Sequence, residues 1–231
     1  MGRSLLCLLV VPLLAGCAAV TPSATTIPSA STALVTRGTR ATSSPMLPAY
    51  TSVVSPVGDV SASWRAGCPV APADLRVVTV TVIGFDGRPG TGRIVVAADV
   101  AQATADVFGS LYAMRYPVAR MEPVEAFGGS DDASMAADNT SAFNCRATTG
   151  GTGFSEHSYG TAIDLNPVEN PYVKGSTVLP EAGRAFVGRK PAPGVVVAGD
   201  AVVRAFADRG FSWGGDWNSL KDYQHFSISG D

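Results

Sequence analysis

The sequence predicts an α+β fold: a single compact domain with a small antiparallel sheet and flanking helices. Of the 231 residues, 46% are hydrophobic and 16% are charged, which is typical of one globular domain with some additional sequence. Strand-like and helix-like stretches follow one another without a regular βα rhythm, and no glycine-rich phosphate loop is present. No internal repeat is found.

The first expected elements are two strands joined by a turn, followed by a helix. In residues 75–100, β-branched residues alternate with other residues on both sides of a Gly/Pro/Asp cluster. Residues 97–116 carry apolar side chains at helical spacing, and the helix is expected to end before Pro117. These apolar positions are Val100, Ala103, Val107, Leu111 and Met114. The remaining expected elements are a strand at 118–127, a helix at 201–210 capped by Gly210, and a final strand at 223–229.

The N-terminus has the pattern of an export signal. Arg3 precedes the short apolar run LLCLLVVPLL, and the motif LAGC ends at Cys17. The run is too short to span a bilayer comfortably, and LAGC resembles a bacterial lipobox, in which the cysteine becomes the lipidated first residue. We therefore expect residues 1–17 to be a signal peptide with a lipid anchor on Cys17. A plain secretory signal cut elsewhere and an uncleaved apolar segment are the alternatives.

Composition separates a linker from a folded domain. Residues 18–63 are rich in Ser, Thr, Ala and Pro with almost no charge, which predicts a flexible linker before a domain at 64–231. An exported chain meets an oxidising compartment, so Cys68 and Cys145 are predicted to form a disulfide, with two buried thiols as the alternative. The net charge of -2 and the lack of a basic stripe exclude nucleic acid as an expected partner. We expect a monomer.

The chain has two histidines, and each lies near a carboxylate. His157, in SEHSYGTAIDLNP, precedes Asp164 by seven residues, with Gly160 between them to permit a bend. Imidazole and carboxylate are suitable zinc ligands, and His225, in KDYQHFSIS, could complete a His/Asp/His set that leaves the fourth position to water. A hydrogen-bonded structural role is the alternative for a histidine.

Asp222 is the candidate general base. It precedes His225 by three residues, which places both side chains on one side of a helical turn or tight loop. A carboxylate near a metal ligand but outside the ligand set can take a proton from water and pass it to a leaving amine. Asp216 lacks this spacing and is ranked below Asp222.

Together, SEHSYGTAIDLNP and WGGDWNSLKDYQHF resemble the zinc D-alanyl-D-alanine carboxypeptidases and related cell-wall endopeptidases. The family pattern is S-x-H-x-x-G-x-A-x-D followed by W-G-G-x-W and D/E-x-x-H, and the resemblance covers residues 120–228. It implies a Hedgehog/DD-peptidase-like zinc fold, one Zn²⁺ ion held by His157, Asp164 and His225, and Asp222 as the catalytic acid/base. The aspartate at 222 is more similar to the L-alanyl-D-glutamate endopeptidase branch than to branches with glutamate there.

The family also uses an arginine to bind the substrate carbonyl and the developing oxyanion. Arg146 is the only Lys or Arg between Arg120 and Lys174, so it is the candidate here. Many relatives carry their arginine in an S-G-Y-R-S segment, where this chain has FGGSDDASM. Arg146 is therefore either a replacement from a neighbouring position or a surface ion-pair partner. A bond between Cys68 and Cys145 would restrain it.

Four further side chains are candidates for ligand orientation or substrate binding: Ser155, Tyr159, Trp213 and Trp217. Ser155 could orient His157 through a hydrogen bond or be an ordinary turn serine. The two tryptophans could line a substrate groove or pack to keep the site dry.

These features favour a zinc peptidase acting on peptidoglycan stem peptides, exported and lipid-anchored at the outer face of the bacterial cytoplasmic membrane. The bond cleaved is of the D-Ala-D-Ala carboxypeptidase or the L-Ala-D-Glu endopeptidase type. One alternative is a non-catalytic cell-wall-binding lipoprotein with the same fold, against which an intact Asp222 argues. The other is a disulfide-stabilised interaction module without metal, which leaves both histidines unexplained.

Overall fold

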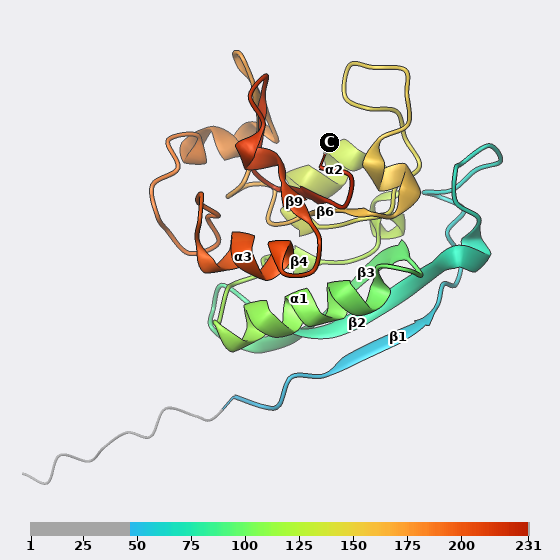
Figure 1. The fold of residues 1–231 in the computed structure, drawn as a ribbon, viewed down its shortest axis with the longest axis horizontal. Helices are drawn as coiled ribbons and strands as arrows, with labels where there is room; N and C mark the ends of the chain where they lie inside the picture. The colour runs from blue at the N-terminus through green and yellow to red at the C-terminus, as the bar shows by residue number, and fades with distance from the viewer. Residues whose placement is uncertain (1–46, 231) are drawn as a thin grey trace, which may run out of the picture. The chain divides into compact units, whose positions relative to one another are not determined.

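The computed structural model describes residues 47–230 and begins with a three-stranded antiparallel sheet (Figure 1). Strands β1 (Ser52–Pro56), β2 (Leu75–Ile83) and β3 (Pro89–Ala97) are adjacent in that order, and Leu75 pairs with Ala97. The β-branched residues of β2 and β3 favour extended backbone and bury one face of the sheet. These two strands form the long hairpin that runs along the bottom of Figure 1.

Helix α1 (Ala101–Ala113) packs on this sheet against β2. Its spacing of apolar residues places Val107, Phe108 and Leu111 on one face, where each is at most 1% exposed. The helix ends at Ala113, before Pro117 as predicted: Arg115 adopts a left-handed backbone with φ 58°, and the Tyr116 N–H donates to the Leu111 carbonyl at 2.9 Å to close the last turn.

The second half of the domain consists of short strands and helices. Its central sheet has the order β6 (Ala162–Asp164), β11 (His225–Ser227), β9 (Ser212–Trp213), with antiparallel neighbours. A second antiparallel sheet contains β10 (Lys221–Asp222), β7 (Tyr172–Lys174) and β8 (Thr177–Leu179), and β4 (Arg120–Met121) pairs with β5 (Asn139–Thr140) in parallel. The helices of this half are α2 (Asp131–Ala136), α3 (Ala201–Ala207) and 3-10 helices at Val124–Phe127, Glu156–Tyr159, Glu181–Phe186 and Gly214–Asp216; a further 3-10 helix, Pro72–Asp74, directly precedes β2.

One hydrophobic core joins the first sheet to these short elements. Phe206 of α3 stacks on Phe226 of β11 with ring centroids 3.7 Å apart, and Ile163 of β6 is fully buried in the same cluster as Ile94 of β3. Strands of two or three residues are not stable by themselves. The packing of β6 and β11 into this core therefore fixes the small sheet that carries two of the candidate metal ligands.

Most of the expected elements are confirmed, as is the α+β class. The hairpin, α1, α3 and the final strand occur where the periodicity predicts them, and Gly210 follows α3 with φ 87°. The expected strand at 118–127 is wrong beyond Met121. Pro123 lacks the N–H that a ladder requires, and residues 124–127 form a 3-10 helix instead.

The predicted linker is wrong for its last part, residues 47–63. Strand β1 pairs with β2 along its whole length, and the Tyr50 hydroxyl donates to the carbonyl of Ala105 in α1 at 2.5 Å. Val60 is buried. Strand β1 is an edge strand with mostly exposed side chains, so main-chain pairing with β2 rather than apolar burial stabilises it. The polar composition of this segment therefore gave no sign of a strand.

The expected signal peptide, Cys17 and the linker as far as residue 46 lie outside the described residues. Among residues 47–230, no helix has both the length and the apolar character needed to cross a bilayer.

Glu169 and Asp138 form a carboxyl pair whose effect on stability can be tested. Burial, and then the charge and hydrogen bond of Asp138, raise the pKa of Glu169 to about 8. The folded protein therefore keeps a proton that the unfolded chain releases above pH about 4. Because the folded state binds more protons in this window, stability falls as the pH rises from about 4 to about 8.

Glu169→Gln removes this ionisation and is expected to raise Tm at pH 8 by a few degrees while changing it little at pH 5. Thermal unfolding followed by circular dichroism at both pH values measures the difference. Glu122→Gln, which alters an exposed ion pair, is the control. An equal shift for Glu169→Gln at both pH values would contradict the proton assignment.

Candidate metal centre

The register of two antiparallel strands places the first two site residues together. Asp164 at the end of β6 pairs directly with His225 at the start of β11. Side chains of directly paired residues extend from the same face of a sheet. Asp164 is also held by backbone hydrogen bonds in both directions with Ser141. The strand pairing therefore brings Asp164 and His225, which are 61 positions apart in the sequence, into contact.

His157 reaches the same point from the 3-10 helix Glu156–Tyr159. The hydroxyl of Ser155 caps this helix by accepting from the His157 N–H at 3.4 Å. Gly160 ends the helix with φ 70°, and a Cβ there would lie 2.7 Å from the N atom of Ala97. Only glycine suits both the left-handed backbone and this close approach. The glycine of the motif thus fixes the helix against the end of β3.

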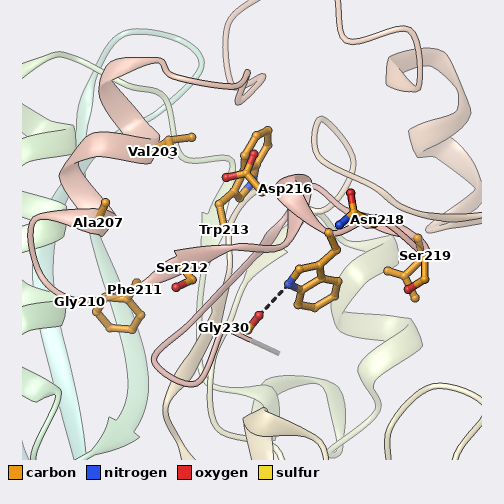
Figure 2. Close-up of a pocket in the computed structure, with 12 residues that line it drawn as sticks. Val203, Ala207, Gly210, Phe211, Ser212, Trp213, Asp216, Asn218, Ser219 and Gly230 are labelled. Carbon is orange, nitrogen blue, oxygen red and sulfur yellow. Dashed lines mark hydrogen bonds between the residues drawn. The ribbon is translucent and has the colours of Figure 1, made fainter.

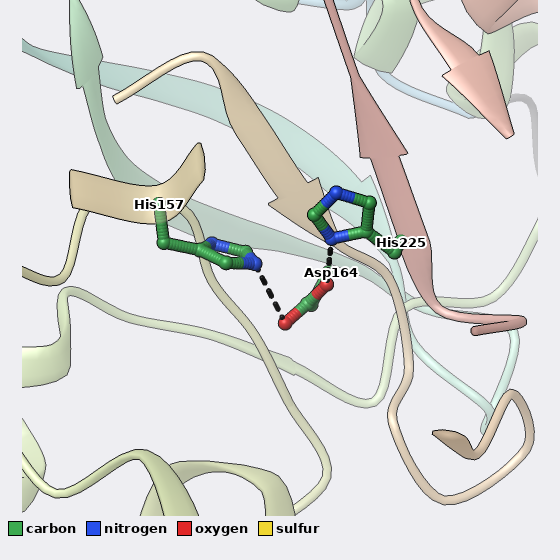
Figure 3. A group of neighbouring side chains, drawn as sticks. All are labelled: His157, Asp164 and His225. Atoms are coloured by element: carbon green, nitrogen blue, oxygen red, sulfur yellow. Dashed lines mark hydrogen bonds and ion pairs between the residues drawn. The ribbon is translucent and has the colours of Figure 1, made fainter. Parts of the chain in front are cut away.

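The side chains of His157, Asp164 and His225 meet in a buried cluster (Figure 3). His157 Nε2 lies 3.1 Å from Asp164 Oδ2, and His225 Nδ1 lies 3.2 Å from Asp164 Oδ1. One ligand atom from each residue falls within 4.8 Å of the others. The opposite nitrogen of His157, Nδ1, is 2.7 Å from the carbonyl oxygen of Ala142. A carbonyl only accepts, so Nδ1 carries a proton, and Nε2, which faces Asp164, is the ring nitrogen placed to bind a metal.

The cluster determines the charge state of Asp164. Burial by itself would raise the pKa of this carboxyl, but the charges and hydrogen bonds of His157 and His225 outweigh burial and lower the pKa well below its usual range. Asp164 is therefore a carboxylate. Together with two imidazoles it forms a set of donors that can hold a metal ion.

Asp222 is partly buried beside this cluster, where it lines the same pocket as His157 and His225. Burial, and then the negative charge of Asp164, raise the pKa of Asp222 to about 6. Within the described part of the chain, its Oδ1 atom has no hydrogen-bond partner. A Cβ on Gly214 would lie 2.7 Å from the Asp222 carbonyl oxygen, so the WGG motif lets the 3-10 helix Gly214–Asp216 pack against this backbone.

Tyr223 anchors the segment between Asp222 and His225. Its carbonyl accepts from Trp213 Nε1 at 2.9 Å, and its ring lies under the Arg189 guanidinium, 4.3 Å from the centroid. These two contacts restrain the turn that carries Asp222 toward the cluster.

The cluster opens into a pocket of about 420 Å³ that also contains the candidate arginine. Its lining comprises Arg146, Thr148, Thr149, Phe154, Ser155, Glu156, His157, Tyr172, Trp217, Leu220, Asp222 and His225. The structure thus brings together both candidate histidine ligands, the candidate base and the candidate arginine at one cavity. The aromatic and aliphatic members supply apolar walls around these polar groups.

Residues 148–228 match the family model for D-alanyl-D-alanine carboxypeptidase. The match supports the resemblance drawn from the two sequence motifs, and it contains His157, Asp164, Asp222 and His225. Arg146 lies two residues before the matched segment. No solved structure gives a significant match to the chain.

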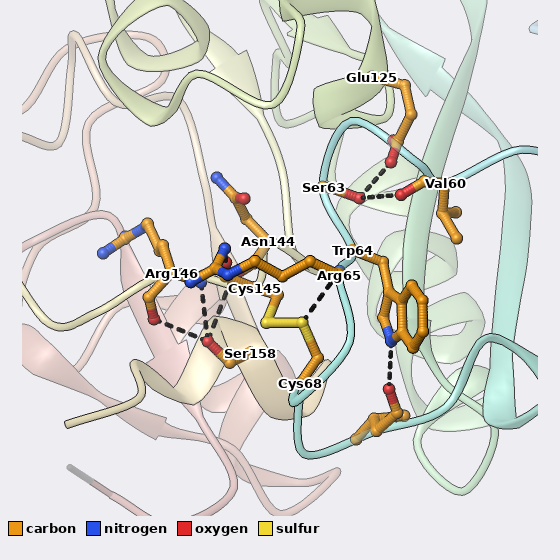
Figure 4. Close-up of a disulfide and its surroundings, with 11 residues drawn as sticks. Val60, Ser63, Trp64, Arg65, Cys68, Glu125, Asn144, Cys145, Arg146 and Ser158 are labelled. Atoms are coloured by element: carbon orange, nitrogen blue, oxygen red, sulfur yellow. Dashed lines mark hydrogen bonds between the residues drawn. A yellow bond between two sulfur atoms is a disulfide. The ribbon is translucent and has the colours of Figure 1, made fainter.

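The predicted disulfide is confirmed: Cys68 and Cys145 are bonded, with Cα atoms 6.0 Å apart (Figure 4). Arg65 Nη1 donates to the carbonyl of Cys145 at 2.5 Å. Ser158, next to His157, binds the main chain of Arg146 twice, accepting from its N–H at 3.0 Å and donating to its carbonyl at 2.8 Å. The backbone of Arg146 is therefore restrained on both sides.

The two tryptophans differ in their roles. Trp213 is 5% exposed and packs near Phe226 in the core, so it serves packing. Trp217 lines the pocket, and its ring centroid lies 5.2 Å from that of His225. The Trp217 indole donates to the Gly230 carbonyl at 2.9 Å, and both residues line a neighbouring groove of about 1050 Å³. Figure 2 shows other residues of this groove, among them Ser212, Trp213 and Asn218. Trp217 and Leu220 line both cavities, so the two are adjacent.

Other predicted residues lie elsewhere or act differently than expected. Ser155 orients His157 through the backbone N–H rather than through the ring. Tyr159 is 40% exposed and is not among the described residues that line the pocket. Asp216 is exposed and lines the neighbouring groove, consistent with its lower rank.

Sequence reasoning missed Asp131. Its Oδ1 atom lies 3.0 Å from Arg146 Nε. Ser130 followed by two aspartates is a helix N-terminus signal, and Ser130 does cap α2 by accepting from the Ala133 N–H at 3.2 Å. That signal predicts a helix but does not reveal that Asp131 contacts Arg146.

Proposed function

We propose that this chain is a zinc-dependent peptidase that hydrolyses peptide bonds in peptidoglycan stem peptides. The observation that carries the proposal is the buried His157/Asp164/His225 cluster sharing one pocket with Asp222, inside the segment that matches the carboxypeptidase family model. A site that only bound metal or wall peptide would not require a further carboxyl, partly withdrawn from solvent, beside the ligands. Asp222 therefore favours catalysis over binding alone.

The donor set fits zinc. Catalytic zinc sites use three protein ligands from histidine and carboxylate and leave one position open. The cluster offers two imidazole nitrogens and one carboxylate oxygen, and the Ala142 carbonyl selects the His157 tautomer that exposes Nε2. We propose one Zn²⁺ ion held by His157, Asp164 and His225.

Asp222 and Arg146 are assigned the proton and charge steps of hydrolysis. A bound zinc would lower the pKa of water and polarise the scissile carbonyl. Asp222 accepts a proton from the attacking water and delivers it to the nitrogen of the leaving amine, and its raised pKa suits this exchange near neutral pH. The guanidinium of Arg146 donates hydrogen bonds to the carbonyl oxygen as negative charge develops there.

The export signal and the lipobox-like LAGC support a location outside the cytoplasmic membrane, with a lipid anchor on Cys17. There the domain would meet cell-wall substrate. The bond cleaved is the terminal D-Ala-D-Ala bond or an internal L-Ala-D-Glu bond, and the aspartate at 222 favours the second.

Digestion of purified peptidoglycan and of a synthetic stem pentapeptide by the full chain tests this function. We expect products that disappear when a chelator is added and return with zinc, as measured by mass spectrometry. Loss of one terminal alanine would identify a carboxypeptidase, and internal cleavage an endopeptidase. The absence of product from folded, zinc-loaded protein would contradict the peptidase proposal and favour a non-catalytic cell-wall-binding lipoprotein.

A further inference from the structure

Arg146 is held at the pocket by a residue of a different segment. Asp131 Oδ1 lies 3.0 Å from Arg146 Nε, and each of the two side chains is 22% exposed. The Nε–H is not aligned with the carboxylate oxygen, so charge rather than a directed hydrogen bond maintains the contact. An ion pair that is largely withdrawn from solvent is screened less than one on the surface.

Asp131 itself has a fixed position. It is the first residue of α2, whose N-terminus is capped by Ser130. The preceding Gly129 has φ 78°, and a Cβ there would lie only 2.0 Å from the carbonyl oxygen of Ala62. The turn before α2 is therefore packed directly against the chain near residue 62, and this packing determines where Asp131 lies.

The main chain of Arg146 is fixed by Ser158 and by the neighbouring disulfide, but these contacts do not orient its long side chain. The guanidinium has two contacts of its own: Nη1 donates to the carbonyl of the adjacent Ala147 at 3.2 Å, and Asp131 is its partner from a different segment. Arg146 lines the pocket, whereas Asp131 is not among the described residues that line it. Asp131 thus contacts the guanidinium without itself lining the pocket. A group in this position does not line the peptide site, so its effect on a bound peptide passes through the residues it interacts with, of which Arg146 is in direct contact.

We propose that Asp131 is a positioning residue that holds the Arg146 guanidinium in the orientation needed to meet the substrate carbonyl. The inference rests on the proposed peptidase function. It also accounts for the departure from the family pattern, because FGGSDDASM supplies the carboxylate that orients an arginine from elsewhere instead of supplying the arginine itself.

A competing explanation is that Asp131 supports the metal cluster, because its charge also interacts with those of His157 and Asp164. The two roles differ in their consequences. Support of the cluster would alter zinc content, whereas positioning of Arg146 would alter turnover with zinc content unchanged.

Kinetics of the full chain on the synthetic stem pentapeptide separate these roles. Asp131→Asn is expected to lower kcat by about 10- to 100-fold with KM within about twofold, because a misplaced group loses transition-state stabilisation. Asp132→Asn, at the adjacent exposed aspartate, is the matched control and should behave as wild type. In an Arg146→Ala background, Asp131→Asn should cause no further loss. A further loss in that background, or reduced zinc content in the single variant, would overturn the proposal.

Labelling with phenylglyoxal, which modifies arginine, tests the pairing without relying on activity. Peptide mass spectrometry should show faster modification of Arg146 in Asp131→Asn than in wild type or Asp132→Asn. Arg120, which is paired with Glu122, is the internal reference. Equal labelling of Arg146 in all three proteins would overturn the proposal. Altered labelling in a chain that cleaves no peptide would instead show that the pairing is correct and the proposed function is wrong.

Discussion

Asp222→Asn is expected to bind zinc as the wild-type chain does and to lose about 100- to 10,000-fold in kcat, which is the range for removal of a general acid or base. The amide has nearly the same shape as the carboxyl, but it neither accepts the water proton nor delivers one to the leaving amine. Asp222 is no part of the His/Asp/His cluster, so metal binding should persist. Zinc analysis by mass spectrometry together with turnover of the stem pentapeptide measures both quantities.

Asp216→Asn is the matched control for this prediction. Asp216 is an exposed aspartate six residues earlier and lines the neighbouring groove rather than the site pocket. Its substitution should leave kcat within about twofold of wild type, the scale expected where no transition-state contact is removed. If Asp216→Asn lost activity and Asp222→Asn did not, the assignment of the base would be wrong.

His157→Ala is expected to lose both zinc and hydrolysis. Loss of an outer hydrogen-bond partner alone weakens metal binding by about 10- to 100-fold, so removal of a ligand should weaken it by at least about 100-fold. Dialysis of the full chain followed by metal analysis, with peptide turnover in parallel, gives the two readouts. Full retention of zinc by this variant would contradict the ligand assignment.

Tyr159→Ala provides a control on the same 3-10 helix. Tyr159 is 40% exposed, whereas the side chain of His157 is 4% exposed. The control should keep zinc and activity. Thermal unfolding of both variants separates loss of a ligand from loss of the fold, because His157 also contacts the Ala142 carbonyl.

Local pattern predicted a large part of the fold. The hairpin β2–β3, helix α1 and helix α3 have the periodicity that their elements require. Val107 and Leu111 of α1 are buried as predicted, whereas Met114 follows the end of the helix and is exposed. The disulfide followed from the number of cysteines and the expected compartment. Ligand chemistry and the family resemblance both predict the set His157, Asp164 and His225, and the structure brings the three side chains together.

Elements without a clear hydrophobic period were missed. Strand β1 has mostly exposed side chains, so only its pairing with β2 distinguishes it from a linker. Helix α2 has six residues, too few to show a clear period. The strand expected at 118–127 is much shorter in the structure, because the apolar residues of this segment pack in a turn and a 3-10 helix around Pro123.

The sequence by itself determined the kinds of chemical group available: two imidazoles, their carboxylates and one arginine in the central segment, with the glycines that permit close turns. Only the tertiary structure decided which of them meet. The β6–β11 register sets Asp164 against His225, and the packing of α2 sets Asp131 behind Arg146. Such contacts join residues far apart in the chain, and their geometry depends on how the whole core packs rather than on any local pattern of residues.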